Sequence, residues 1–543
     1  MAKRVTARKK AGARLLFMTI DAEAPFIVEW VAYHRELGFD RIVVFAYVDD
    51  VNTTALLKAL AAKKVIELHL QGPEPGSSIQ ASAINLANDA TMLKDVEWAM
   101  WLDGDEFLVV STGDGTLKAL LETLADRDGM LIPRRMMGDG GNDRFPGRFV
   151  SEQFTDAAAA EDDSNLQMKT LFRCTKHIEG FSRFGYHRPK IREGVDPAEL
   201  NFVMASGNGI DMRHRPHRRW LRGEEFNRID KMQPDEHGYA LAQINSYALR
   251  TPEIFALERF AGQDIAQALA DGDTQQNTVE AYRDQNHVAT QDRRILRLEA
   301  ATGTEMDRIR ALTGVAKAEA LVHEDLASRV ADIPASFLDA CIATRPARAE
   351  PRTFPLTLPD EEAALVRKEY AKADTILEYG SGGSSFVALE SGDKTLFTVE
   401  SDRSWALTIH DTLQAAHPHA NFTVQYVDVG PTKAWGKPSN AQGYGRYSRY
   451  PSSVWDLVQF QQPDVVLVDG RFRVACFLTT LFRTKKPVTL LFDDYTGRIN
   501  YHWIEKYVKP SQTAGRMARF EIKPTALPAD DLTEITAAYA NPE

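Results

Sequence analysis

Short apolar runs alternate with amphipathic stretches from Arg14 to about Pro133. The runs RLLFMTI, RIVVFAY, VIELHL and WAMWLD have the length and composition of buried strands, and stretches of helical periodicity separate them. One helix is expected to start at Pro25, where a missing N–H costs nothing, and to end at Gly38. Strands that alternate with helices predict a mostly parallel sheet with helices on both faces.

The pattern changes twice further along the chain. Residues 134–250 are less regular, and residues 251–340 have a helical, strongly charged pattern. The proline-rich stretch at 345–359 opposes a continuous helix or central strand, so we place a domain boundary there. After it, TILEY, KTLFTVE, FTVQYVDV, VVLVD and VTLLFDD predict a second α/β sheet. We expect two Rossmann-like α/β domains, at 13–265 and 359–543, joined by a helical connector and linker at 266–358.

Composition narrows the class of protein. The 543 residues are 44% hydrophobic and 26% charged, as in ordinary globular proteins, and the net charge of −11 opposes a large nucleic-acid surface. Three widely spaced cysteines support neither a disulfide framework nor a zinc site. The apolar run from Leu15 to Ile20 is too short for a signal peptide or a membrane span. We therefore expect a cytoplasmic protein with no integral membrane segment and no nucleic-acid partner.

An acidic pair follows the strand WAMWLD. Asp103 and Asp105 stand at its carboxyl end, which is where open parallel sheets place their ligand crevice. Two carboxylates one residue apart can hold a divalent cation against a diphosphate. The spacing alone is weak evidence, because Asp-x-Asp also occurs at 126–128 and 271–273, so the preceding strand carries the prediction.

Several further blocks resemble the GT-A glycosyltransferases, in particular a bacterial, family 2-like branch. They are the segment Asp21-Ala-Glu-Ala-Pro25 with its helix EWVAYHRELGFD, then RIVVFAYVDD, WLDGDEF, MMGDGGN and INSYALRTPEIFALERFAG. The resemblance covers roughly residues 13–265, and the blocks together are far more specific than the Asp pair.

This resemblance implies transfer of a sugar from a nucleotide-sugar donor to a hydroxyl of a glycan or polysaccharide acceptor. Asp21, Glu23 and Asp50 would contact the nucleoside, and Asp103 and Asp105 would contact Mn²⁺ or Mg²⁺ and the diphosphate. For Asp50 and the preceding Asp49, an alternative is that they cap the following helix.

The sequence departs from this family at Ser246, where relatives usually carry a histidine that would be a further metal ligand. His214 and His217 are possible substitutes, and a solvent-facing loop is the alternative for their segment. The catalytic base is unassigned, with Asp139 and Asp143 as candidates.

A glycine loop in the second series resembles the class I S-adenosylmethionine-dependent methyltransferases, over about residues 360–520. In TILEYGSGGSS a strand ends in Glu378 before Gly380 and Gly382, and the next strand ends in Glu400. The resemblance implies that these two glycines lie beside the methionine part of S-adenosylmethionine and that Glu400 binds the ribose. Asp428, after the third strand, would lie near the adenine.

Methyl transfer needs alignment and at most one base. Asp469, at the end of DVVLVD, is the first candidate base, with His502 and Asp494 behind it; a strand-end cap is the alternative. A loop between the third and fourth strands carries Trp435, Tyr444, Tyr447 and Tyr450, which would form a lid on sugar rings or a surface loop without that role.

Two functions follow from these expectations. Either both domains are active, and the second methylates the glycan that the first extends, or the second is a catalytically silent binding module.

Overall fold

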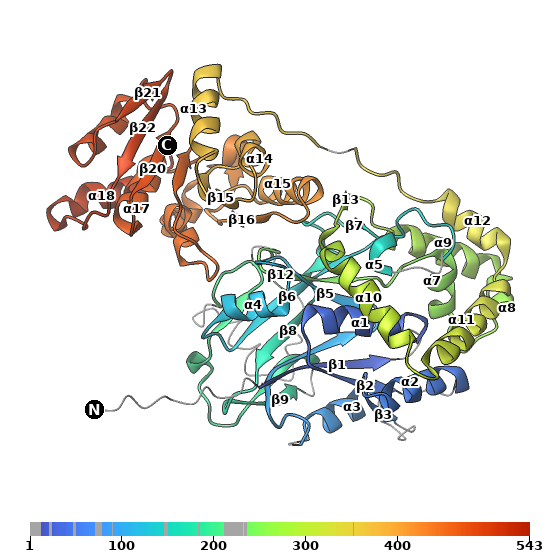
Figure 1. Cartoon of the computed structure of the whole chain (residues 1–543). Helices are drawn as coiled ribbons and strands as arrows, with labels where there is room; N and C mark the ends of the chain where they lie inside the picture. Colours follow the sequence, from blue (N-terminus) through green and yellow to red (C-terminus); the bar gives the residue numbers. More distant parts are fainter. Residues whose placement is uncertain are drawn as a thin grey trace, which may run out of the picture.

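The computed structural model describes residues 12–20, 24–46, 50–70, 79–89, 91–145, 150–182, 185–210, 232, 236–350 and 352–543 (Figure 1). Two sheets with their helices account for most of these residues.

The first sheet is built from the amino-terminal half of the chain. Its strands are β1 (Ala13–Ile20), β2 (Arg41–Ala46), β3 (Glu67–Leu70), β4 (Val96–Asp103), β5 (Glu106–Val110), β6 (Gly129–Met136), β8 (Met168–Arg173), β11 (Phe202–Met204) and β12 (Ala242–Ser246). They lie in the order β3-β2-β1-β4-β8-β6-β12-β5, with β11 beside β6. Strands β3, β2, β1 and β4 are parallel, whereas β8 is antiparallel to both neighbours. The strand order reverses between β1 and β4, and ligands of open α/β sheets bind at such a point.

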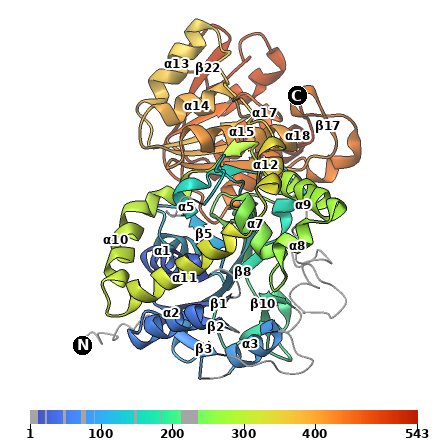
Figure 2. The ribbon, with the colours of Figure 1, turned by 90° about the vertical axis from the view of Figure 1, so that its right-hand side faces the viewer.

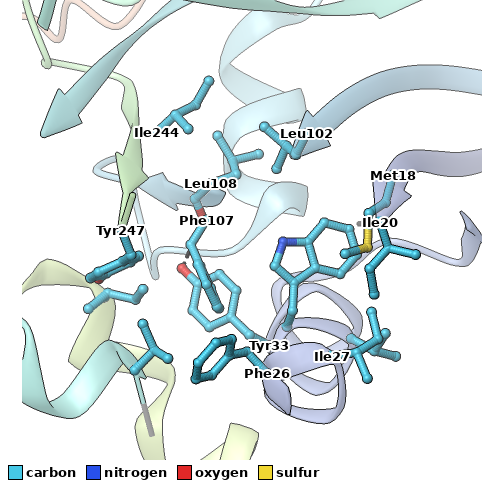
Figure 3. Packing of buried hydrophobic residues seen from close by; sticks show 14 of the residues in the cluster. Met18, Ile20, Phe26, Ile27, Tyr33, Leu102, Phe107, Leu108, Ile244 and Tyr247 are labelled. Carbon is cyan, nitrogen blue, oxygen red and sulfur yellow. Dashed lines mark hydrogen bonds between the residues drawn. The ribbon is translucent and has the colours of Figure 1, made fainter. Parts of the chain in front are cut away.

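Helices cover this sheet and extend beyond it. They are α1 (Ile27–Leu37), α2 (Val51–Ala62), α3 (Ile79–Ala87), α4 (Leu117–Leu124), α5 (Val150–Gln153), α7 (Pro252–Arg259), α8 (Ile265–Leu269), α9 (Gly272–Gln285), α10 (Glu299–Arg310), α11 (Val315–Ala331) and α12 (Ala335–Ala343). As expected, α1 follows a 3-10 turn that contains Pro25 and ends at Gly38, whose φ of 125° suits glycine. One hydrophobic core runs from Leu16 to Cys341, so the helices after residue 265 pack on the first sheet. Figure 3 shows part of this core, where Tyr33 of α1 packs on Phe107.

The second sheet lies in the carboxyl-terminal part. Its strands are β14 (Thr375–Tyr379), β15 (Thr395–Glu400), β16 (Asn421–Tyr426), β19 (Val465–Val468), β20 (Val488–Phe492), β21 (Gln512–Ala514) and β22 (Met517–Ile522), in the order β16-β15-β14-β19-β20-β22-β21. The first five in this order are parallel, and β22 is antiparallel to β20. Its helices are α13 (Asp360–Tyr370), α14 (Gly383–Glu390), α15 (Arg403–Ala416), α16 (Arg449–Ser452), α17 (Arg473–Arg483) and α18 (Leu532–Tyr539). Here the order reverses between β14 and β19.

Among the described residues, six further strands form three antiparallel pairs. They are β7 (Asp156–Ala157) paired with β13 (Thr290–Gln291), β9 (Ile178–Ser182) with β10 (Gly185–Ile191), and β17 (Thr432–Lys433) with β18 (Lys437–Pro438). 

The chain between α12 and α13 has no helix or strand in its described residues, 344–350 and 352–359. Its Phe354 packs on Phe386 of α14, with ring centroids 5.7 Å apart, and on Trp405 of α15, at 5.1 Å. The carbonyl oxygen of Pro355 approaches Gly383 so closely that a Cβ there would lie 2.3 Å away. The last part of this linker therefore belongs structurally to the second sheet and its helices.

The predicted fold class, two Rossmann-like α/β units, is confirmed, and the strands before Pro133 and after residue 374 lie where the pattern placed them. The stretch 134–250 is more ordered than its irregular pattern suggested, because it contains β8, β11 and β12. Strand β12 carries buried Gln243 and Asn245, so its apolar alternation is weak. The predicted domain limits stay predictions. Within the described residues, no helix is long and apolar enough to cross a membrane.

Candidate functional site

The Asp pair lies at the point where the strand order of the first sheet reverses. Strand β4 ends at Asp103, Gly104 and Asp105 form the turn, and β5 starts at Glu106. Leu102 and Phe107 on either side are buried in the core of Figure 3, which fixes the turn. The sequence placed this pair correctly at a strand end. Asp21 and Glu23, which the resemblance assigns to the nucleoside, lie outside the described residues.

Two cations and a third carboxylate surround the pair. Lys169 on β8 places its Nζ 2.8 Å from Asp103 Oδ2 and 2.5 Å from Glu106 Oε2. Arg134 on β6 contacts Glu106 Oε1 at 2.6 Å and Asp103 Oδ2 at 3.4 Å. Glu106 is fully buried, and although burial alone would raise its pKa, Lys169 and Arg134 hold it below the usual range. Sequence reasoning missed both cations; the available signal was a lysine inside the apolar run MKTLFR.

Asp105 has a raised pKa and contacts Ser246 and Tyr247. Burial, with Glu106 and Asp103 close by, raises the pKa of Asp105 to about 6. Its Oδ2 accepts a long hydrogen bond of 3.4 Å from Ser246 Oγ, and its backbone carbonyl accepts one from the Tyr247 N–H. Ser246, the position at which the resemblance expects a histidine, is thus adjacent to the Asp pair.

We tested whether these residues suit a divalent cation. Asp103, Asp105 and Ser246 present hard oxygen atoms, which Mn²⁺ and Mg²⁺ prefer. Burial first, and then the neighbouring carboxylates, raise the pKa of Asp105, and a bound cation would offset both effects by stabilising the charged form. Within the described ranges, no group of three or more His, Cys, Asp or Glu residues is arranged to hold a metal. The donors fit a cation that takes its other ligands from a bound diphosphate.

The other predicted residues of the first unit have structural contacts. Asp50 caps α2 by accepting hydrogen bonds from the N–H groups of Asn52 at 3.1 Å and Thr53 at 2.6 Å. It also lines a cavity of about 290 Å³ between α2, α7 and α11, together with Arg329. The structure thus confirms that Asp50 caps α2. Its contact with a nucleoside stays a prediction.

Both candidate bases of the first unit, Asp139 and Asp143, form ion pairs with Arg345. Asp139 is buried, contacts Arg345 Nε at 2.5 Å and accepts a hydrogen bond from the Tyr282 hydroxyl at 2.6 Å. Asp143, which is exposed, also pairs with Arg345. These contacts favour a structural role for both. Asp49, His214 and His217 lie outside the described residues.

The second site is a glycine loop at the reversal between β14 and β19. Gly380 has a φ of 103°, and a Cβ there would lie 2.9 Å from the Gly470 backbone, so only glycine fits. Beyond it, a Cβ on Gly382 would meet no atom within 4 Å. Glu378 is buried and accepts hydrogen bonds from Tyr370 and Ser385, and burial raises its pKa to about 6. Glu378 therefore ties the loop to α13 and α14.

Glu400 ends β15 as predicted, but its carboxylate is covered. It is only 8% exposed, and Oε1 accepts hydrogen bonds from the N–H groups of Ser401 at 2.6 Å and Asp402 at 3.1 Å. The turn Ala434–Gly436 lies over it, held by a 2.8 Å hydrogen bond from Ser401 Oγ to the Gly436 carbonyl. Oε2 has one longer contact, 3.3 Å from Ser381 Oγ, and so keeps acceptor capacity.

The residues expected around S-adenosylmethionine are thus arranged in order along the sheet edge. Space lies beside Gly382, Glu400 follows on the next strand, and Asp428 follows β16, where it pairs with Arg446 at 3.1 Å. This donor set fits a nucleoside with ribose hydroxyls. Access to Glu400 requires the turn Ala434–Gly436 to shift.

Asp469 lies beside the glycine loop, and its pKa is raised. Burial raises its pKa well above the usual range; the Arg473 guanidinium, 3.1 Å away, lowers it, while Asp493 raises it further. Asp493 and Asp494 follow the neighbouring strand β20, and Asp494 pairs with Arg498 at 2.7 Å. A carboxylate with a raised pKa at the site is suited to accept a proton.

The aromatic loop is only partly available to a ligand. Trp435 is 87% exposed and Tyr444 is 61% exposed, whereas Tyr447 and Tyr450 are buried in the core of the second sheet. Of the two alternatives for this loop, a lid on sugar rings therefore does not hold for the last two residues, because their rings pack on Phe472. His502 stacks on the Tyr495 ring and hydrogen bonds its carbonyl.

Comparison with solved structures finds a methyltransferase-like relative. No protein-family model matches the chain, and no curated protein matches it. A solved methyltransferase-like protein from Silicibacter pomeroyi is 42% identical, with 35% of this chain covering 98% of that one at a TM-score of 0.34.

Other solved structures are much less similar. S. aureus TarS 1-349 in complex with UDP is 11% identical, with 57% of this chain and 92% of that chain covered at a TM-score of 0.22. A putative glucose-1-phosphate thymidylyltransferase from Bacillus anthracis is 9% identical, with coverage of 25% and 62% and a TM-score of 0.18. Likenesses this low carry no functional argument.

Proposed function

We propose that this chain is a transferase with two sites; a methyltransferase-like protein that is 42% identical over 98% of its own length supports the second of them. The first site moves a sugar from a nucleotide-sugar donor to a glycan hydroxyl. The second methylates the glycan with S-adenosylmethionine.

The observation that supports sugar transfer is the charge arrangement at the end of β4. Asp103 and Asp105 lie at the strand-order reversal, and Lys169 and Arg134 stand directly behind them. A departing nucleoside diphosphate needs opposite charge placed where its own charge develops. The two fixed cations supply part of it from the protein.

A Mn²⁺ or Mg²⁺ ion held by Asp103 and Asp105 would add further charge neutralisation at the diphosphate. Glu106 keeps Lys169 and Arg134 in place through contacts of 2.5 and 2.6 Å. Because these groups are buried or half-buried, their interactions are stronger than they would be in water.

Release of nucleoside diphosphate from a panel of nucleotide sugars, with and without Mn²⁺, tests this function. We expect Asp105→Ala to abolish metal-dependent release while the near-ultraviolet circular dichroism stays that of the wild type. Unchanged release in this variant would remove the proposed site. Asp128→Ala, in the Asp-x-Asp at 126–128 away from the strand end, is the matched control and should retain activity.

For methyl transfer, the supporting observation is Asp469 beside the glycine loop, with its raised pKa. Asp469 would take the proton of the acceptor hydroxyl as the methyl group arrives. The alternative is a catalytically silent module, which the covered carboxylate of Glu400 favours. Calorimetric titration with S-adenosylmethionine separates the two, because a silent module that has lost its ligand shows no binding heat.

A further inference from the structure

The carboxyl-terminal unit contacts the first unit at Arg135, the residue that follows Arg134 on β6. Arg135 on β6 is buried, and its guanidinium lies 2.7 Å from Asp411 on α15. The second oxygen of Asp411 accepts a 2.7 Å hydrogen bond from the Ala160 N–H. Among the residues that the structure describes, Asp411 is the only carboxylate in contact with this guanidinium. The pair is a buried connection between two units that are separate in sequence, and Figure 2 shows the units against each other.

Arg135 is the direct neighbour of Arg134, which contacts Asp103 and Glu106. Strand neighbours point to opposite faces, so one side chain reaches the Asp pair while the next reaches the other unit. The β6–β8 ladder ends at Pro133 with Met168, and from Arg134 to Met136 the ladder partner is β12. On the β8 side the Arg134 N–H donates a 2.8 Å hydrogen bond to the Gln167 carbonyl, outside the ladder.

Tyr239 links the two arginines directly. Its hydroxyl donates a 2.8 Å hydrogen bond to the Arg134 carbonyl, and the Arg135 guanidinium lies 5.2 Å from its ring centroid. The ring also lies 5.6 Å from that of His410, the neighbour of Asp411. A closed set of contacts thus runs from α15 through Arg135 and Tyr239 to the backbone of Arg134.

We propose that Asp411 is a positioning residue for sugar transfer: by holding Arg135 and Tyr239, the methyltransferase-like unit sets the place of Arg134 at the Asp pair. The inference rests on the proposed function of the first site. It gives the second unit a role in the first reaction whether or not it methylates anything.

The test distinguishes an effect on the position of Arg134, which changes kcat, from an effect on the stability of the fold, which changes the melting temperature. Asp411→Asn leaves a buried guanidinium without its countercharge, so it should lower both the melting temperature and kcat. In the double variant Arg135→Met with Asp411→Asn, neither buried charge remains and the side-chain oxygen of the introduced asparagine still accepts the Ala160 N–H, so stability should be kept. We expect this variant to melt like the wild type but to release nucleoside diphosphate with a kcat lowered by roughly tenfold to 100-fold, with a smaller change in KM.

Tyr239→Phe is a second variant that keeps the ring and removes only the hydroxyl, and it should lower kcat in the same way. Asp411→Glu should restore most of the activity that Asp411→Asn loses. Ser404→Ala is the matched control, since it removes an exposed contact of 3.0 Å between the units, with Glu161, away from β6. It should have wild-type kcat.

Wild-type kcat in both the double variant and Tyr239→Phe would overturn the inference and leave the proposed function standing. Absence of nucleoside diphosphate release by the wild-type protein from every donor would instead overturn the proposed function, and the inference with it.

Discussion

Glu106 allows a quantitative test of the charge arrangement behind the Asp pair. It is fully buried and contacts Lys169, Arg134 and the Asp103 N–H, at 2.5, 2.6 and 2.9 Å. In Glu106→Gln the shape is kept and the charge is lost, while Asp103 remains in contact with both cations. Removing one member of a buried ion pair costs about 3 to 5 kcal/mol. Because Asp103 remains, we expect the lower end, about 3 kcal/mol.

Urea unfolding followed by near-ultraviolet circular dichroism measures this loss. With a slope of about 3 kcal/mol per molar urea, the midpoint of the first unit should fall by roughly 1 M. Glu122→Gln on α4 is the matched control, because Glu122 is 69% exposed and pairs with Lys118 at 3.8 Å. Such a surface pair contributes about 0.3 to 0.5 kcal/mol. Equal losses in the two variants would refute the reasoning.

The difference in unfolding free energy between the wild type and Glu106→Gln should depend on pH with a definite sign. Since the pKa of Glu106 is lower in the folded protein than in the unfolded chain, its charge stabilises the fold at pH values above the ordinary glutamate range. This stabilisation is lost as the pH falls below that range. The difference in unfolding free energy between wild type and Glu106→Gln should therefore be full at pH 7 and shrink toward pH 3. A difference that grows on acidification would contradict the ion-pair explanation.

Three further predictions concern other parts of the molecule. Gly380→Ala should abolish S-adenosylmethionine binding in calorimetry, since its Cβ would lie 2.9 Å from Gly470 at a φ of 103°; retained binding would contradict the assigned site. Asp493→Asn should move the acid limb of the methylation pH profile to lower pH, because Asp493 raises the pKa of Asp469; an unmoved limb would exclude Asp469 as the base. Asp50→Ala should lower the free energy of unfolding by about 1 kcal/mol, and Asp50→Ser should recover most of it, because serine also caps helices; equal losses would argue against capping.

The sequence was sufficient for features that depend on local pattern. Asp103 follows an apolar run, and Gly380 lies between a strand and a helix, so periodicity and turn chemistry placed both. Lys169 and Arg134 escaped notice because they lie on strands whose polar residues weaken the alternation. The contact between Arg135 and Asp411 joins residues 276 positions apart, and no local pattern encodes such a pairing. Burial likewise decided the roles of Tyr447 and Tyr450, which composition alone made equivalent to Trp435.

The docking of the linker on the second unit limits where this chain can be divided. Because Phe354 packs on Phe386 and Trp405, a chimera joined at Pro359 would expose an apolar patch on α14 and α15. It would also remove the backbone that excludes any side chain at Gly383. Natural or designed recombination should therefore succeed with junctions upstream of Phe354, where the chain is still free of the second unit's core.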